Sequence, residues 1–136
     1  MNSITLTRTI DASPDAVRAS ITDIEPFMEA SGVDEVSVDD GTVRVANLVG
    51  IMTVELTLAL VDDPDAILAY EQREGIFEEM HTTYAVAPAG DGTEVRATTE
   101  FELGVTVIGD ALDSTVIERQ RRKELTAQFD WLEEVC

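Results

Sequence analysis

The side chains that could do chemistry gather in two stretches of this chain. The first reads EEMHTTYAV and contains His81, which is the single histidine, together with Tyr84. The second is the charged run ERQRRKE near the C-terminal end, with Arg121 at its centre. An imidazole can act as an acid or a base near neutral pH, and a phenol or a guanidinium can stabilise an oxygen that becomes negative. His81, Tyr84 and Arg121 are therefore the candidates for acid, base or oxyanion partner.

Alternation along the first stretch predicts where its side chains point. If Met80, Thr82 and Tyr84 face a covering helix, His81 faces solvent, because successive side chains of a strand point to opposite sides. We interpret His81 as a surface or strand-packing residue, with a role as a base as the alternative. Tyr84 could instead be a core tyrosine with its hydroxyl at the rim. The polar groups that this pattern could place inside an apolar pocket are Asn47, Thr82, Tyr84 and Thr99.

The remaining candidate groups do not form a known catalytic or metal-binding pattern. Glu55 and Glu71 fall in predicted strands and fit an exposed face in a chain with 28 acidic residues. The acidic turns at 39–40 and 62–65 lack the ligand spacing of an EF-hand loop. The sequence contains no nucleophile elbow, phosphate-binding loop, dinucleotide fingerprint or HExxH motif. We expect no cofactor, no metal and no dedicated catalytic constellation.

Most of the chain is predicted to form short strands. Apolar residues recur at every second position, and clusters of Asp, Gly and Pro such as 39–41 and 88–92 separate the segments. Tight turns between successive strands favour an antiparallel sheet. The predicted strands cover residues 3–10, 33–38, 42–49, 51–61, 66–74, 76–87 and 93–103.

Two short helices are expected between the first and second strands. Ser13 suits the N-cap, Pro14 the first helical position, and Asp15 the positive end of the helix dipole. Pro26 interrupts this helix, and a second short helical segment ends at residues 31–32.

The stretch 109–136 is predicted to be a helix roughly 40 Å long. Its apolar stripe is broken at 118–124, where Arg121 falls on the line of Ile117 and Leu125. One interpretation is a solvated face whose arginines extend their charged heads into water. The other is that the centre of the helix roofs a cavity. In either case we expect this helix to cover the apolar face of the sheet.

The composition limits the class of protein. The 136 residues suit a single domain, 1–136, with a core of its own. The net charge of −19 disfavours nucleic-acid partners, and dispersed acid with a single lysine, Lys123, resembles the proteins of salt-loving archaea. No apolar run approaches a membrane span and no signal peptide is visible, so we expect a soluble cytoplasmic protein. Cys136, the one cysteine, is expected to be a frayed terminal thiol.

The order of elements and the stretch IDASPDAV at 10–17 resemble the START-like superfamily, the Bet v 1-type, polyketide cyclase-like, helix-grip proteins. Many members carry an I-x-A-[SP]-x-x-V pattern where the first strand ends and the first helix begins. The resemblance implies an α+β fold in which a seven-stranded curved antiparallel sheet wraps around a long C-terminal helix, with a cavity between them. Members bind lipids, sterols, polyketides and plant hormones; some are cyclases or hydratases, and others are co-chaperones.

We therefore expect the chain to bind a small hydrophobic or amphipathic molecule, lipid or polyketide-like, between sheet and helix. The alternatives are a polyketide cyclase-like or hydratase-like enzyme, and a co-chaperone-like module that binds a partner protein. The oligomeric state stays open. The facing of each strand depends on its register, because a slip of one residue exchanges the two faces. The expected ligand-binding residues are Met52, Val54, Leu56, Tyr84, Thr99, Phe101, Ile117, Arg121 and Leu125.

Overall fold

The computed structural model describes residues 1–103 and 113–136. The strands are β1 (Asn2–Ile10), β2 (Glu35–Asp39), β3 (Thr42–Val49), β4 (Met52–Leu60), β5 (Leu68–Glu74), β6 (Phe77–Ala89) and β7 (Gly92–Leu103). The helices are α1 (Pro14–Thr22), α2 (Ile24–Glu29) and α3 (Ser114–Val135). All seven strands join one antiparallel sheet in the order β1-β7-β6-β5-β4-β3-β2.

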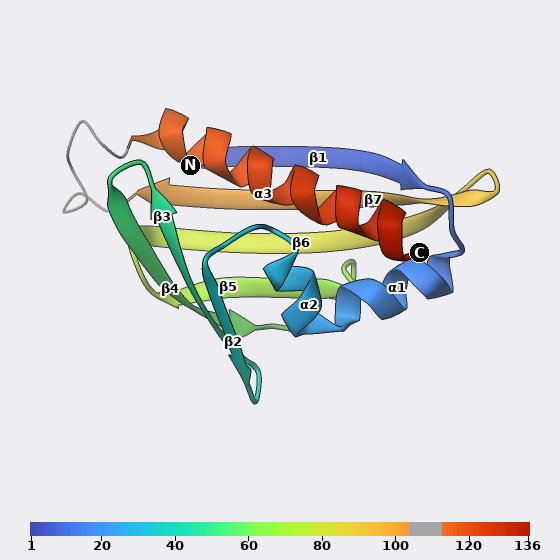
Figure 1. Cartoon of the computed structure of the whole chain (residues 1–136), viewed down its shortest axis with the longest axis horizontal. Coiled ribbons are helices and arrows are strands. Elements are labelled where there is room, and N and C mark those ends of the chain that lie inside the picture. The colour runs from blue at the N-terminus through green and yellow to red at the C-terminus, as the bar shows by residue number, and fades with distance from the viewer. Residues whose placement is uncertain (104–112) are drawn as a thin grey trace.

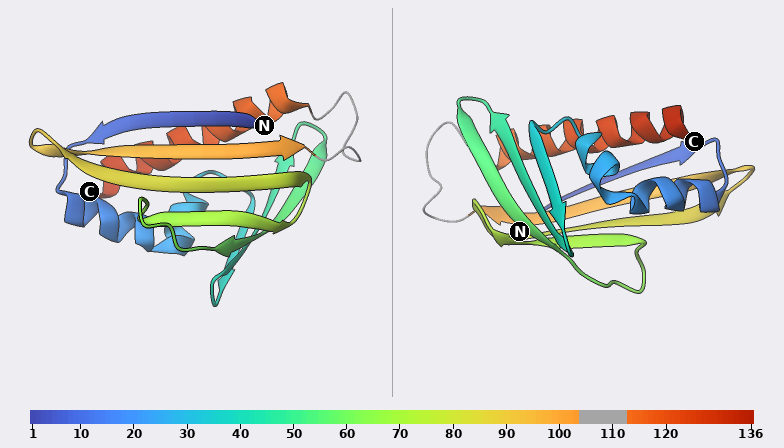
Figure 2. Two further views of the ribbon diagram at one scale, coloured as in Figure 1. Left: turned by 180° about the vertical axis from the view of Figure 1, so that it is seen from behind. Right: turned by 60° about the horizontal axis from the view of Figure 1, so that its bottom comes forward.

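The sheet curves around α3, as Figure 1 shows. The long helix runs over β1, β7 and β6, while β2, β3 and β4 rise steeply at one end of the sheet (Figure 2). The short helices α1 and α2 lie on the same side of the sheet as α3 and pack against β6 and β2 respectively. This is the predicted α+β helix-grip arrangement, so the fold-class prediction is confirmed.

Period-two alternation places the predicted faces correctly in the long strands. Along β6 the side chains of Met80, Thr82 and Tyr84 are buried, whereas His81 between them is partly exposed on the outer face. Tyr84 is paired with Ala97 of β7, and Thr82 with Thr99, so both strands turn their small and apolar side chains towards α3. The concave face of the sheet is therefore the core face.

The start of α1 follows the predicted capping, and α3 begins with a cap that the sequence analysis did not predict. The Ser13 hydroxyl accepts a hydrogen bond from the backbone N–H of Ala16 at 3.2 Å, and Pro14 is the first residue of α1. Asp113 caps α3 in the same way, with its carboxylate accepting from the N–H of Val116 at 2.9 Å. These bonds satisfy donors that the first turn of a helix leaves without a partner.

Six of the seven strands differ from their predicted bounds by one or two residues at an end. Residues 88–92 were expected to form a loop, but Pro88 and Ala89 extend β6 and Gly92 already belongs to β7. The ladder continues because Pro88 lies at the very end of its strand, where a missing N–H costs little. The predicted strand at 33–38 begins only at Glu35. The predicted helix at 109–136 runs from Ser114 to Val135, about 33 Å, and residues 109–112 lie outside the described residues.

Arg8 is the one charged residue on the inner side of β1, and α3 provides its partners. Its guanidinium pairs with the carboxylates of Asp130 and Glu133, and it lies 5.5 Å from the centre of the Phe129 ring.

Among the described residues, no helix is long and apolar enough to cross a membrane.

Candidate functional site

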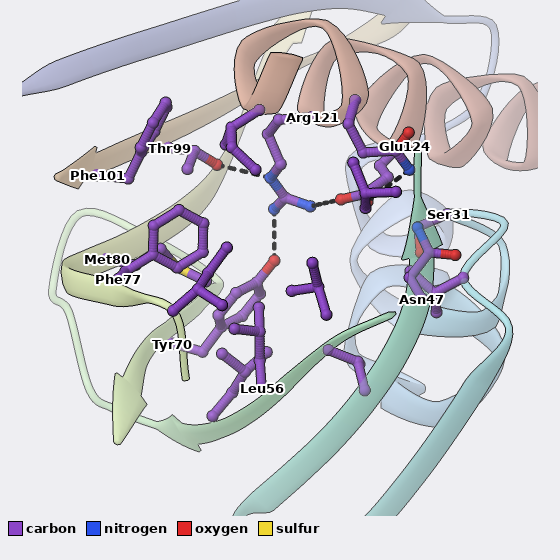
Figure 3. A pocket seen from close by; sticks show the side chains of 18 of the residues that line it. Ser31, Asn47, Leu56, Tyr70, Phe77, Met80, Thr99, Phe101, Arg121 and Glu124 are labelled. Atoms are coloured by element: carbon purple, nitrogen blue, oxygen red, sulfur yellow. Dashed lines mark hydrogen bonds and ion pairs between the residues drawn. The ribbon is translucent and has the colours of Figure 1, made fainter. Parts of the chain in front are cut away.

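A cavity of about 70 Å³ lies between the middle of α3 and the concave face of the sheet (Figure 3). Strands β3 and β4 and helix α2 close one side, and β5, β6 and β7 close the other. Its lining is mostly aliphatic and aromatic, with a polar corner under α3. The lining residues are Met28, Ser31, Val33, Val45, Asn47, Val49, Val54, Leu56, Leu58, Tyr70, Ile76, Phe77, Met80, Thr99, Phe101, Ile117, Gln120, Arg121 and Glu124.

Arg121 hangs from α3 into this cavity and makes its polar corner (Figure 3). Its Nε donates to the hydroxyl of Thr99 at 2.9 Å, its Nη1 donates to Glu124 at 2.9 Å, and its Nη2 donates to the hydroxyl of Tyr70. The side chain is only 12% exposed. Three elements, α3, β5 and β7, thus fix the guanidinium in one orientation.

A second row of polar groups lies deeper, behind Arg121. The hydroxyl of Tyr84 donates to Oε1 of Gln128 at 2.7 Å, and Nε2 of Gln128 donates to the carbonyl of Phe27 at 3.1 Å. Nη2 of Arg121 is 3.4 Å from the Tyr84 hydroxyl. Because Gln128 and Tyr84 are fully buried, these bonds are needed to offset the loss of water. They tie α2, α3 and β6 together beneath the cavity.

Arg121 and Glu124 are the only charged residues that line the cavity in the described part of the chain. They stand one helical turn apart, and the Glu124 side chain is 14% exposed. Its second carboxylate oxygen accepts from Gln120 at 3.0 Å. The pair brings one positive and one negative charge, so the cavity carries no net charge of its own.

Burial acts on two pKa values at this site. It raises the pKa of the Tyr84 phenol well above 10, and neighbouring Tyr70 raises it further, against an opposing effect of Arg121. Burial acts to lower the pKa of Arg121, but Tyr70, Tyr84 and Glu124 outweigh it, and the net direction is upward. Arg121 is therefore a permanent cation, and Tyr84 is a neutral phenol at any ordinary pH.

The arrangement can hold an oxygen atom. The Tyr70 hydroxyl accepts from Arg121 and is also hydrogen-bonded to the hydroxyl of Tyr84. A guanidinium has five N–H donors. The bonds of Arg121 to Thr99, Glu124 and Tyr70, together with the 3.4 Å contacts of Nη2 with the hydroxyls of Thr82 and Tyr84, occupy four of them and leave one at Nη1. One donor is thus left over at the polar corner. His81 is not among the residues that line the cavity and belongs to the outer face of β6.

Six of the nine residues expected to bind ligand line the cavity, namely Val54, Leu56, Thr99, Phe101, Ile117 and Arg121. Tyr84 and Leu125 are buried behind it, and Met52 does not reach it, because the start of β4 projects beyond the helices and leaves the side chain 40% exposed. The polar middle of α3, predicted either to be solvated or to roof a cavity, has one side of each kind. Arg121 and Glu124 roof the cavity, whereas Arg122 and Lys123 on the other side of the helix are exposed to solvent.

Sequence reasoning missed the partners of Arg121. Tyr70 falls in the predicted strand at 66–74, but the register of β5 on β6 was needed to bring it under α3. Glu124 was assigned to a polar run with no role of its own. Its spacing of three residues from Arg121 was the available signal, because side chains three apart on a helix are neighbours.

Solved structures with the same arrangement of helices and strands define the fold class. The chain superposes with a TM-score of 0.77 on the Zhui aromatase/cyclase from Streptomyces sp. R1128, at 20% identity over 97% of this chain and 93% of the other. A protein from Thermus thermophilus gives 0.76 at 20% identity, over 98% and 95%. A START superfamily protein from Mycobacterium smegmatis gives 0.74 at 14% identity, over 97% and 94%. The chain thus has the START-like helix-grip fold.

The family follows from the sequence as a whole. The model of the polyketide cyclase/dehydrase and lipid transport family matches residues 1–136. The chain belongs to this family, and the resemblance seen in its first helix and its order of elements is confirmed. No curated protein matches the chain.

Proposed function

We propose that the chain binds a small apolar or amphipathic molecule in the cavity beneath α3. One observation carries the proposal: a fixed, buried guanidinium faces a cavity whose other walls are mostly apolar. An enclosed apolar pocket with a few convergent polar groups is the usual form of a small-molecule site. The description of the family, with its lipid transport and polyketide chemistry, supports the same class of ligand.

The bound molecule would lie with its apolar part on β3 and β4 and its polar end under α3. Val45, Val54 and Leu58 supply the aliphatic wall, while Arg121 supplies the hydrogen-bond donor. The cavity of about 70 Å³ is smaller than the roughly 150 Å³ that holds a benzene molecule in an engineered protein core. A ring-sized ligand therefore displaces side chains as it enters, and Leu56 and Phe77 are among the wall residues that are only half-buried.

The second candidate function is a cyclase-like reaction in the same cavity. The contact between Arg121 and the Tyr70 hydroxyl favours it, because such a pair can stabilise an enolate oxygen as negative charge develops there. The residue proposed as the proton donor is then Tyr70, in place of the Tyr84 and His81 expected from the sequence. Tyr70→Phe would lower turnover of a polyketide-like substrate while leaving its binding within a few-fold.

We also propose the setting in which the protein works. The net charge of −19 with one lysine supports a cytoplasm of high ionic strength, where salt screens the self-repulsion. We propose residues 1–136 as one folding unit under those conditions.

The test begins with protein purified in concentrated KCl, examined by native mass spectrometry and then extracted with organic solvent. A co-purifying apolar molecule at near-stoichiometric yield is the expected result. Val54→Phe places a ring in the cavity and should abolish that mass, whereas Thr53→Phe, which is exposed on the neighbouring position of β4, should retain it. Equal occupancy in the two variants, or an apo mass together with no thermal shift across lipids and aromatic polyketides, would contradict the proposal.

A further inference from the structure

The cavity has an unused hydrogen-bond donor but no net charge, and this restricts the chemistry of the ligand's polar end. The hydroxyl of Tyr70 is bonded to Arg121 and Tyr84, whereas one N–H on Nη1 of Arg121 has no oxygen acceptor among the described residues. A carboxylate, a ketone or a quinone could each supply such an oxygen. The charges around the corner decide between them.

Glu124 already neutralises the guanidinium. Its Oε1 lies 2.9 Å from Nη1 of Arg121, and both side chains are almost out of contact with water. Any ligand oxygen that accepts from Nη1 of Arg121 comes within several ångströms of the Glu124 carboxylate, which is bound to the same nitrogen. In a space that holds little water, like charges at such a separation repel strongly, since solvent screens them poorly.

Glu124 is also held in place from its other side. Its Oε2 accepts from Nε2 of Gln120 at 3.0 Å, so the carboxylate is bound by two neighbours of its own helix. An anionic ligand would have to displace Glu124 from both of them before it could take over Arg121. An uncharged carbonyl needs no such exchange, because it uses the N–H of Arg121 that Glu124 leaves unoccupied.

We infer that the site selects ligands whose polar end is an uncharged oxygen acceptor, such as a ketone or quinone carbonyl, and that Glu124 is the residue that rejects carboxylates. This inference rests on the proposed ligand-binding function. It assigns Glu124 to specificity: the residue sets which molecules enter and has no part in reacting with them.

The test uses two pairs of probes with matched shape and different charge: acetophenone with benzoate, and 2-acetylnaphthalene with 2-naphthoate. Binding is measured by calorimetry and by ligand-observed NMR. Wild-type protein should bind each ketone at least roughly tenfold more tightly than its carboxylate partner. Glu124→Gln keeps the length and one acceptor oxygen of the side chain, and in this variant the difference should close or reverse.

The net charge of −19 also repels anions. Two controls separate this general repulsion from the effect of Glu124. Glu134→Gln removes one negative charge from an exposed position of α3 and should leave the preference unchanged. Raising KCl from about 0.2 M to about 3 M should abolish the general repulsion but keep the preference due to Glu124, which lies where salt screens less.

The possible failures have different meanings. Two results would overturn the role of Glu124 and leave the binding function standing. One is that the wild type binds a ketone and its carboxylate partner equally tightly. The other is that a folded Glu124→Gln protein keeps the wild-type preference for the ketone. Absence of binding by all four probes to both the wild type and Glu124→Gln overturns the role and counts against the proposed function as well.

Discussion

Replacing Arg121 by methionine should destabilise the protein chiefly by leaving the Glu124 carboxylate without an opposite charge, with Gln120 still donating to it. Arg121→Met removes the N–H groups that donate to Thr99 and Tyr70. It also leaves the Glu124 carboxylate, whose side chain is only 14% exposed, without a neighbouring positive charge. Breaking one side of a buried ion pair costs about 3–5 kcal/mol, and the small residual exposure here argues for the lower end, about 3 kcal/mol. For a chain of this length that corresponds to a fall in Tm of roughly 10 °C.

The second half of this prediction concerns the double variant. Arg121→Met combined with Glu124→Leu removes both charges, and its free energy of unfolding should return to within about 1 kcal/mol of the wild type. If removing either partner alone costs about 3 kcal/mol, the double-mutant cycle should give a coupling energy of about 5 kcal/mol. Urea denaturation at constant KCl, followed by circular dichroism, measures all four proteins on one scale.

A matched pair on the outer surface provides the control. Arg73 and Glu71 approach each other at 2.8 Å, but their side chains are 59% and 37% exposed. The same substitutions there should give a coupling energy below about 1 kcal/mol, because water screens exposed pairs. If the Arg121–Glu124 cycle is additive within about 0.5 kcal/mol, the reasoning about a buried, mutually neutralising pair is refuted.

Three further predictions follow from other features. Burial raises the pKa of Tyr84 well above its unfolded value of 10.0, so only the unfolded state loses this proton as the pH passes 10. The free energy of unfolding is therefore unaffected by Tyr84 below about pH 10 and falls above it. Tyr84→Phe should reduce that fall when urea denaturation is measured across about pH 9–11. The charge of −19 predicts that Tm rises steadily with KCl, and a Tm independent of salt would contradict the self-repulsion argument. A β-carbon on Gly92 would lie 2.4 Å from the carbonyl oxygen of Ile10, so Gly92→Ala should cost about 2 kcal/mol; an unchanged urea midpoint would show that β1 yields freely there.

The fold was predictable because its signals are local and repeated. Capping at Ser13 and Pro14, and alternation along β6 and β7, do not depend on distant parts of the chain. Alternation determines which face a side chain takes but not whether anything covers that face. Met52 shows the difference, since it was expected in the pocket and lies 40% exposed at the end of its strand.

The candidate site was predictable only in part, because its polar corner is assembled from three elements. Arg121 could be singled out by its place on the apolar line of the helix. Tyr70 becomes its partner only through the pairing of Tyr70 with Thr82 across β5 and β6, and a register cannot be read from the residues alone. Glu124 was hidden by composition, because one buried carboxylate is hard to recognise among 28 acidic residues.

The pairing of β1 with β7 has a consequence for how the protein is made. Thr5 and Thr98 face each other across this pair although 93 residues separate them in the chain. During synthesis β1 emerges first, but it can pair with β7 only after β7, the last strand, has been made. Helix α3 emerges later still. Contacts between such distant segments slow folding to the range of milliseconds to seconds. The cavity is thus among the last features to form, and a ligand can meet its site only on a finished chain.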